Sequence, residues 1–298
     1  MNRKAAEPID ALVSQLADYY AQDTLASDEA AADLPPVVDH RASQSPVKNQ
    51  GTRGTCVAHA AMGLIEAFPH IPGDLSEQYT HYKFNEFLHW PHNLNQGLMT
   101  TKAAPYLARA DGRISLEAEW PYIPVQATID QMVEMGTYGP PPAARNNQIY
   151  GISSYKIITD QGLTGESIKN TRYLESLLHL GYSIVIGTWV SWDDKDNDGV
   201  LDPVLDPNGN PIGRGGHAML VVGYNRPEEY LMIKNSWAPS WGHDGYAYFH
   251  YDLVRSCFKY GFVADQVVPG DGEPVRTCWC KRLLDSIRQF FGCGGPGT

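Results

Sequence analysis

The sequence predicts an α+β fold, with helices in the first part of the chain and strands in the second. Over about residues 45–150, helix-like stretches alternate with loops rich in His, Asn and Pro. Over about residues 151–268, strand-like runs rich in Val, Ile and Tyr dominate. A chain of 298 residues, of which 43% are hydrophobic, can bury a substantial core. We therefore expect one domain over residues 35–268, flanked by the segments 1–34 and 269–298.

The composition argues against several classes of protein. A formal net charge of −11 argues against a nucleic-acid-binding surface or one for anionic membranes. No apolar run approaches the ~18 residues of a membrane-spanning helix, and the first residues do not resemble a signal peptide. Five cysteines are few for a fold built on disulfides. We therefore expect a protein of the cytoplasm, a reducing compartment, without a transmembrane segment.

The segment 1–34 is predicted to hold a short amphipathic helix followed by an acidic linker. In this segment seven acidic residues outnumber two basic ones. Its apolar residues keep the spacing of one helix face at Ile9, Leu12, Val13, Leu16 and Tyr20. We expect this helix to dock on the domain.

Cys56 stands at the start of a predicted helix. From Val57 onward the apolar residues recur at the spacing of one helix face, and Thr55 is suited to the N-cap position. A thiol in the first helical turn meets unpaired backbone N–H groups and the positive end of the helix dipole, which favour the thiolate. The same N–H groups can hold a negatively charged oxygen as it forms. Such a cysteine alone is more often structural, so a catalytic role requires partners elsewhere in the chain.

Two strand-like runs on either side of the polar loop 225–229 are predicted to form a β-hairpin. If Tyr224 pairs with Tyr230, Asn235 is the diagonal neighbour of His217 on one face of the hairpin. The pattern therefore predicts a histidine that an asparagine orients. It does not bring this pair to the cysteine, because that contact depends on the fold.

An acidic run over residues 193–202 resembles part of a Ca²⁺-binding loop. The first nine positions of such a loop match at Asp194, Asp196, Asp198, Gly199 and Asp202. The twelfth position is Leu205 instead of a bidentate Glu. We interpret the run as a solvated acidic loop, and the alternative is a structural Ca²⁺ site that calorimetric titration would detect.

The segment 269–298 is predicted to form a basic amphipathic helix, in contrast to the acidic chain as a whole. We expect it to fold back onto the domain or to fray. One alternative is docking to a membrane surface or to a partner's groove, with acylation of its cysteines. Another is metal binding by the cysteines, although their spacing is irregular. These cysteines are Cys278, Cys280 and Cys293.

A series of short motifs resembles, in order, the papain-like cysteine peptidase family. The resemblance covers about residues 36–265, and its order is far more specific than any single motif. The motifs are Pro36–Arg41, Ser45–Gly51, Gly54–Cys56, Leu75–Gln78, Gly97–Met99, Trp120–Tyr122, Gly216–Ala218, Lys234–Trp237 and Trp241–Tyr246. The resemblance implies a papain-like two-lobed fold, with a helical lobe, a β-barrel-like lobe and the active-site cleft between them.

The resemblance also assigns roles to individual residues. Cys56 would be the nucleophile, and His217 would hold the proton and return it to the leaving amine. Asn235 would orient the imidazole as the third member of a triad does. Three further residues are implied by the family alone: Gln50 as the side-chain donor to the oxyanion, Trp237 as a shield over the His–Asn bond, and Gly97 in the loop that lines the substrate cleft.

The chain departs from the family at three positions near the nucleophile. Arg53 stands where the family usually has a disulfide cysteine, Val57 where it has Trp, and His59 where it has Phe. We interpret His59 as a packing residue, because the family has a core aromatic there. The departures, together with insertions before His217, indicate a divergent member of the family, and we expect one of bacterial type.

We therefore predict a thiol peptidase, an endopeptidase that hydrolyses peptide bonds in peptide or protein substrates through an acyl-enzyme and needs no cofactor. One alternative is an acyltransferase or amidase that uses the same triad. Another is a non-catalytic peptide-binding relative, although such a protein would not need the four polar catalytic positions. A further alternative concerns the segment 1–34, which would be an inhibitory propeptide instead of a docked helix.

Overall fold

The computed structural model describes residues 34–276, apart from residues 69–70, 72–73, 92–94, 96, 110–111, 147–149, 160–167, 195–198, 214, 265 and 270–274. The predicted N-terminal helix and the predicted tail helix with its cysteines lie outside the described residues. Within them, no helix is long and apolar enough to cross a membrane.

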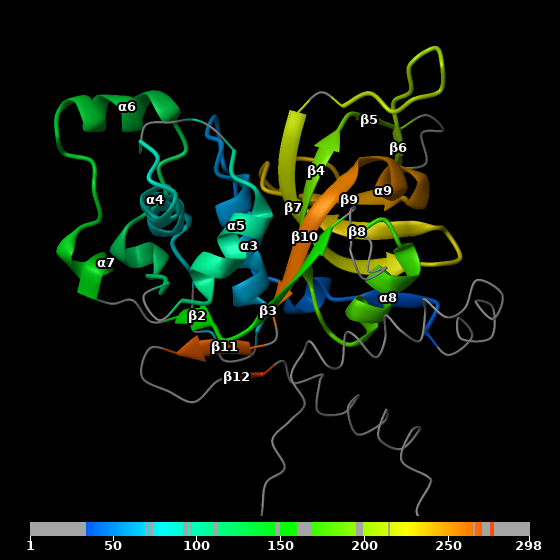
Figure 1. The fold of residues 1–298 in the computed structure, drawn as a ribbon, viewed down its shortest axis with the longest axis horizontal. Helices are drawn as coiled ribbons and strands as arrows, with labels where there is room; N and C mark the ends of the chain where they lie inside the picture. Colours follow the sequence, from blue (N-terminus) through cyan, green and yellow to red (C-terminus); the bar gives the residue numbers. More distant parts are fainter. Residues whose placement is uncertain are drawn as a thin grey trace, which may run out of the picture.

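The described residues form an α+β fold in which helices gather beside a large sheet (Figure 1). The helices α4, α6 and α7 lie on one side of the molecule and the sheet on the other, with α3 and α5 between them. The helices are α3 (Cys56–Glu66), α4 (Glu77–Phe87), α5 (Thr100–Leu107), α6 (Gln126–Glu134), α7 (Pro142–Asn146), α8 (Thr171–His179) and α9 (Tyr251–Cys257), with two 3₁₀ turns at Arg41–Ser43 and Glu117–Glu119. The predicted α+β class is confirmed.

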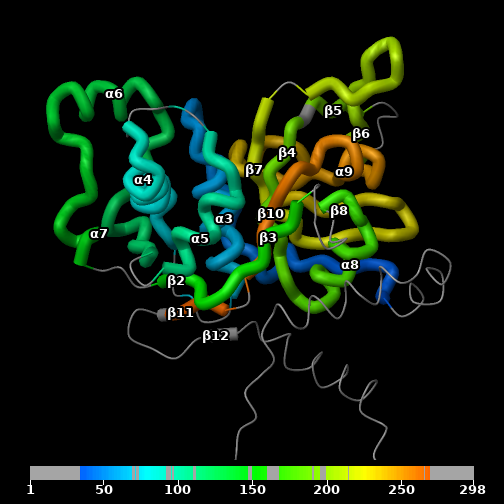
Figure 2. Tube along the Cα trace, in the orientation of Figure 1, coloured from blue at the N-terminus to red at the C-terminus, as the bar shows by residue number. Residues whose placement is uncertain are grey.

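The larger sheet has the strand order β3-β10-β4-β7-β8-β9-β6-β5, and β1 pairs with β7 beside this path. Its strands are β1 (Val37–Asp39), β3 (Tyr155–Thr159), β4 (Ile184–Val190), β5 (Trp192–Asp193), β6 (Val200–Pro203), β7 (Gly215–Asn225), β8 (Tyr230–Lys234), β9 (Tyr246–His250) and β10 (Phe258–Ala264). A smaller sheet joins β2 (Tyr150–Ile152), β11 (Gln266–Pro269) and β12 (Val275–Arg276). In it, β2 and β11 lie side by side although they are far apart in the sequence (Figure 2).

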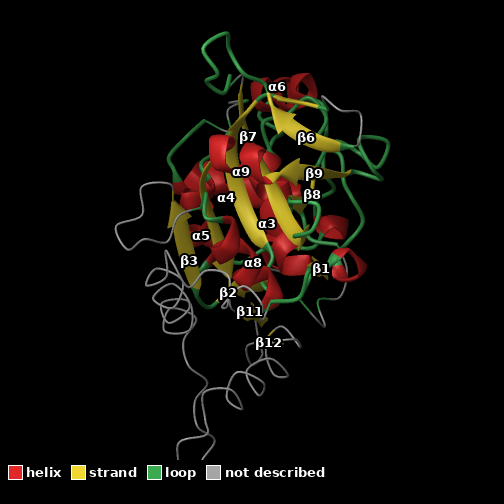
Figure 3. Ribbon diagram, turned by 90° about the vertical axis from the view of Figure 1, so that its right-hand side faces the viewer, coloured by secondary structure: helices red, strands yellow, loops and turns green. Residues whose placement is uncertain are grey.

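Both faces of the larger sheet are covered, because alternate residues of its central strands enter two different cores. In β7, Met219 and Val221 belong to the core that contains α8 and α9. Ala218, Leu220 and Val222 belong to the core that contains α3 and α5. Helices accordingly flank the strands when the molecule is turned by 90° (Figure 3). The continuous apolar run of β7 is typical of a strand buried on both faces.

The hairpin of β7 and β8 forms with a register that differs from the predicted one at the turn. Asn225 pairs with Tyr230, so the predicted pairing at this end is wrong by one residue. A β-bulge within residues 221–223 takes up the extra residue, and beyond it Leu220 faces Lys234. The predicted register is therefore restored toward the end of the hairpin that carries the predicted His–Asn pair.

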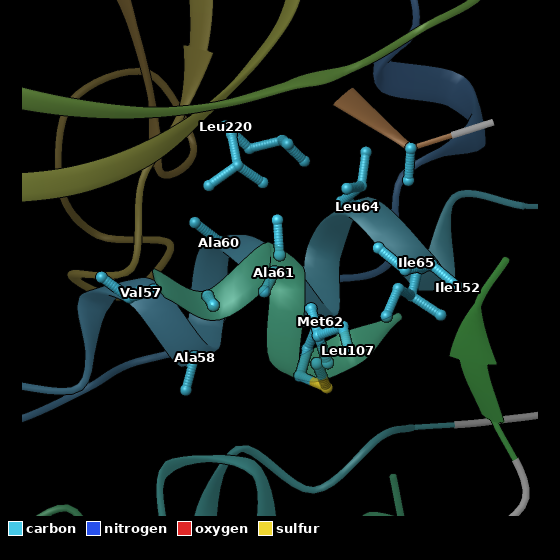
Figure 4. Packing of buried hydrophobic residues seen from close by; sticks show 14 of the residues in the cluster. Val57, Ala58, Ala60, Ala61, Met62, Leu64, Ile65, Leu107, Ile152 and Leu220 are labelled. Carbon is cyan, nitrogen blue, oxygen red and sulfur yellow. The ribbon is translucent and has the colours of Figure 1, made fainter. Parts of the chain in front are cut away.

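Helix α3 is buried on nearly all sides. Of its eleven residues, only Glu66 is more than slightly exposed. Its side chains lie between Leu220 of β7 and Leu107 of α5 (Figure 4). Small residues allow this close approach, because Gly63 has Leu220 within ordinary contact distance of where its Cβ would lie. Packing on both sides thus fixes the start of α3, where Cys56 lies, against the large sheet.

Candidate active site

Cys56 is the first residue of α3, as predicted, and its side chain is 6% exposed. Thr55 occupies the N-cap position, but its hydroxyl does not cap the helix. Instead, its Oγ1 lies 2.6 Å from the hydroxyl of Tyr122. Thr55 therefore holds the predicted N-cap position, but a tertiary partner takes its hydroxyl, so its side chain does not cap the helix.

The fold brings the thiol of Cys56 to strand β7. The backbone N–H groups of Ala218, the residue that follows His217, of Val57 and of Cys56 lie near enough to the thiol to lower its pKa. Burial raises the pKa of the Cys56 thiol and outweighs these N–H groups, which lower it. The helix start alone therefore does not produce the predicted preference for the thiolate, and a nearby positive charge is needed to do so.

His217 and Asn235 form the pair that the hairpin predicts. Nε2 of His217 lies 2.8 Å from Oδ1 of Asn235, which also accepts from the backbone N–H of Ser236 at 2.8 Å. The His217 ring stacks on Trp237, with ring centroids 4.6 Å apart and planes inclined by 24°. Burial lowers the pKa of His217, and the hydrogen bond to Asn235 opposes this shift. The geometry suits an imidazole whose orientation and tautomer the amide sets.

Gln50 joins the loop before α3 to the loop after β8. Its Nε2 donates to the carbonyl of Arg53 at 2.7 Å, and its Oε1 accepts from the hydroxyl of Ser236 at 2.6 Å. Its backbone N–H donates to the carbonyl of Ser236 at 2.8 Å. An amide nitrogen carries two hydrogens, so one remains to be donated to a substrate oxygen. The side chain of Gln50 is thus bonded to the loop before α3 and to the loop after β8, and it is 8% exposed.

Asn95 is a residue of the site that sequence reasoning missed. Its Oδ1 accepts from the backbone N–H of Gly54 at 2.5 Å, and its Nδ2 donates to the carbonyl of Thr52 at 3.1 Å. These bonds cross more than forty residues of sequence, so no local pattern indicates them. The neighbouring Gly97, predicted to line the substrate cleft, is exposed, and a Cβ there would meet open space.

Arg53, where the family usually has a disulfide cysteine, is buried and anchors the loop that precedes Cys56. Its Nη1 donates to Oε1 of Gln78 at 2.6 Å and to the carbonyl of Ile123 at 2.9 Å. Its guanidinium lies over the ring of Tyr122, 5.2 Å from the centroid. The side chain thus ties the loop to α4 and to the segment after the second 3₁₀ turn.

The Arg53→Met protein is expected to lose about 1–3 kcal/mol of unfolding free energy, because the variant leaves the carbonyl of Ile123 unpaired and leaves Oε1 of Gln78 with only the backbone N–H of Ile123 as a donor. Urea denaturation would measure the loss. The matched control is Arg255→Met, since Arg255 is exposed, bonds Asp252 three residues away and lies over the ring of Tyr251. An equal stability of the two variants would contradict this anchoring role.

The acidic loop is only partly described. Oδ2 of Asp194 accepts from the backbone N–H of Gly199 at 3.2 Å, and Asp202 lies in β6 opposite Asp193. Asp196 and Asp198 lie outside the described residues. Within the described ones, His, Cys, Asp and Glu form no group that could hold a metal ion. The Ca²⁺ interpretation stays a prediction.

Comparisons with known proteins find sequences and folds similar to those of this chain. A family model described as papain family cysteine protease matches residues 34–259. Papaya proteinase 4 from Carica papaya is 27% identical over 222 residues, which are 73% of this chain and 56% of the relative. Cysteine proteinase 1 from Zea mays is 26% identical over 227 residues, which are 70% of this chain and 53% of the relative. The matches thus span about half of the length of these relatives.

The fold is also similar to that of solved structures. Xylellain, a cysteine protease from Xylella fastidiosa, superposes with a TM-score of 0.60 over 78% of this chain and 87% of its own, at 23% identity. This likeness concerns the fold, whereas the family model covers most of the sequence, including every residue of the predicted triad. The chain therefore belongs to the papain family of cysteine proteases, and its α+β fold is the papain fold.

Proposed function

We propose that the protein is a cysteine-type peptidase, an endopeptidase that hydrolyses peptide bonds with Cys56, His217 and Asn235. The observation that carries the proposal is the 2.8 Å contact of His217 Nε2 with Asn235 Oδ1. His217 lies on strand β7 next to Ala218, whose backbone N–H is near enough to the thiol of Cys56 to lower its pKa. The family membership supports the same assignment.

In the proposed reaction, Sγ of Cys56 attacks the carbonyl carbon of the scissile peptide bond. The resulting oxyanion accepts hydrogen bonds from the free N–H of Gln50 and from the N–H at the start of α3. His217 gives its proton to the leaving amine as the C–N bond breaks, which leaves a thioester. Water then attacks the thioester, the C–S bond breaks, and the acid and the thiol are released. No step needs a cofactor.

Burial shapes the protonation of the two reacting groups. It raises the pKa of Cys56 and lowers the pKa of His217, so each group alone is neutral. Transfer of the proton from the thiol to the imidazole produces two opposite charges that stabilise each other. Asn235 supports this transfer, because its hydrogen bond raises the pKa of His217.

Labelling with a peptidyl epoxide directed at papain-like thiols tests the proposal. We expect a single addition at Cys56, read by intact mass and peptide mapping, that persists near pH 5, where an ordinary thiol is protonated. The Cys56→Ala protein is the control, and Cys257, a buried cysteine with a raised pKa, should stay unlabelled. A folded protein that is not labelled at Cys56 would contradict the proposal and favour a non-catalytic, peptide-binding relative.

Product analysis separates hydrolysis from acyl transfer. A peptide substrate is incubated with and without an added amine, and the products are identified by mass. A peptidase releases the free acid as its main product in both reactions. Amide formed in preference to acid would indicate an acyltransferase that uses the same thiol.

A further inference from the structure

A small, partly open cavity lies between α3 and strand β7, beside the predicted triad. Its volume is about 20 Å³, and a cavity of roughly 10–15 Å³ suffices for one water molecule. Ala60 of α3 and Leu220 of β7, which lie next to each other in Figure 4, are part of its wall. His59, Glu77 and Asn235 line the same cavity.

Each of these three lining residues has one buried polar atom without a hydrogen-bond partner. Among the residues that the structure describes, Nε2 of His59, Oε2 of Glu77 and Nδ2 of Asn235 have no hydrogen-bond partner. The three side chains are nearly inaccessible, with exposed fractions of 6%, 1% and 4%. Buried polar groups are rarely left unpaired in native proteins, and ordered water commonly supplies the partner.

The hydrogen-bonding roles of the three atoms match those of a single water. Nδ1 of His59 lies 3.1 Å from the carbonyl of Thr55, which only accepts, so Nδ1 carries the hydrogen. Burial lowers the pKa of His59 to about 3, so the ring is neutral and its Nε2 is an acceptor. Nδ2 of Asn235 is a donor. A water that donates to His59 can therefore accept from Asn235.

Glu77 is the third partner of the water. Burial raises the pKa of Glu77 to about 8, although the ammonium of Lys48, whose Nζ lies 2.6 Å from Oε1, opposes that rise. Where the carboxyl is ionised, Oε2 accepts the second hydrogen of the water, and where it is neutral, Oε2 can carry the proton and donate it to the water. In either form the water satisfies all three unpaired atoms.

We propose that this cavity binds one water, and that His59 is a positioning residue that uses it to fix the side-chain amide of Asn235. The water donates to Nε2 of His59 and accepts from Nδ2 of Asn235. This contact adds to the hydrogen bond from the backbone N–H of Ser236, which already holds Oδ1 toward His217. This inference rests on the proposed function, because it concerns the orientation of the same histidine.

The hydrogen bonds from the start of α3 to His217 would form a chain in which each group accepts from the next. The carbonyl of Thr55 accepts from His59, which accepts from the water, which accepts from Asn235. Oδ1 of Asn235 then accepts from Nε2–H of His217. A phenylalanine at position 59, as the family has, would interrupt this chain at the ring. His59 would therefore act on His217 indirectly, through the water and Asn235.

The His59→Phe protein tests the proposal, because it keeps an aromatic ring beside Tyr122 and removes the acceptor. The water then loses its acceptor on the ring and holds Nδ2 of Asn235 less tightly, while the N–H of Ser236 alone still orients the amide. We expect kcat for a peptide substrate to fall about tenfold with little change in KM. Because the hydrogen bond from Asn235 raises the pKa of His217, its loss should move the alkaline limb of the pH–rate profile to lower pH. The melting temperature should not fall.

Two further variants make the result specific. His59→Gln places an amide oxygen where Nε2 lies, and it should restore most of kcat and the alkaline limb. His179→Phe, a half-buried histidine on α8 that does not line the cavity, should behave as the unmodified protein. A His59→Phe protein with unchanged kcat and pH profile would overturn the positioning role, while peptidase activity of the unmodified protein would keep the proposed function.

A crystal structure of the Cys56→Ala protein tests the water without reference to activity. We expect one ordered water within hydrogen-bond distance of His59 Nε2, Glu77 Oε2 and Asn235 Nδ2. A dry cavity would overturn the inference even if the protein is an active peptidase. If the water is present and the unmodified protein neither cleaves peptides nor reacts with the epoxide, the proposed function fails and the hydration of the cavity stands.

Discussion

The His217→Ala protein is expected to lose at least about 10⁴-fold in kcat for peptide hydrolysis. Without the imidazole, the thiol of Cys56 has no base, and its pKa, which burial already raises, has no positive charge to lower it. The leaving amine also loses its proton donor. The loss should appear both in peptide hydrolysis and in the rate of epoxide labelling at neutral pH.

The control for this variant is His243→Ala, which removes an exposed histidine from the same half of the molecule. It should keep activity within about twofold of the unmodified protein, since surface substitutions are usually nearly neutral. Circular dichroism must show that the His217→Ala protein is folded, because the ring stacks on Trp237. A folded His217→Ala protein that retains a tenth or more of kcat would contradict the assigned role.

The Gln50→Glu protein is expected to lose about 10²–10³-fold in kcat, with a smaller change in KM. The substitution keeps the size of the side chain and an acceptor for the hydroxyl of Ser236. It removes the N–H groups of Nε2, one of which bonds the carbonyl of Arg53 while the other is free for the oxyanion. The introduced carboxylate would also repel the negative charge that develops on the substrate oxygen.

The control is Gln44→Glu, a half-buried glutamine outside the predicted site, which should leave kcat unchanged. Urea denaturation of both variants separates a loss of catalysis from a loss of fold. If Gln50→Glu lowers stability but changes kcat less than threefold, Gln50 is a structural link between the two loops and does not bind the oxyanion.

Local sequence patterns predicted those parts of the site that depend on neighbours in sequence. The start of α3 at Cys56 follows from a change to helical periodicity after a glycine-rich run. The pairing of His217 with Asn235 follows from hairpin arithmetic, and a bulge within residues 221–223 makes that arithmetic correct at the site although it fails at the turn. In a strand that is apolar on both faces, the sequence does not indicate where a bulge will form.

Contacts between distant segments could not be predicted in this way. Gln50 bonds Ser236 across 186 residues of sequence, and Thr55 gives its hydroxyl to Tyr122 instead of its own helix. The family pattern predicts a packing role for His59. The unpaired Nε2 of its ring and the cavity beside it become visible only in the folded structure. For such side chains the neighbouring sequence indicates at most one role. Their contacts with distant residues determine which role they have in the folded protein.

Arg53 has a consequence for the conditions in which the protein can be made and used. An anchor built from a disulfide forms only under oxidising conditions, whereas a nucleophilic thiol is kept reduced by the opposite conditions. The guanidinium anchor bonds Gln78 and Ile123 and lies over the ring of Tyr122, so it contains no covalent cross-link. An excess of dithiothreitol can therefore protect Cys56 from oxidation throughout refolding, purification and assay without weakening the loop that holds it.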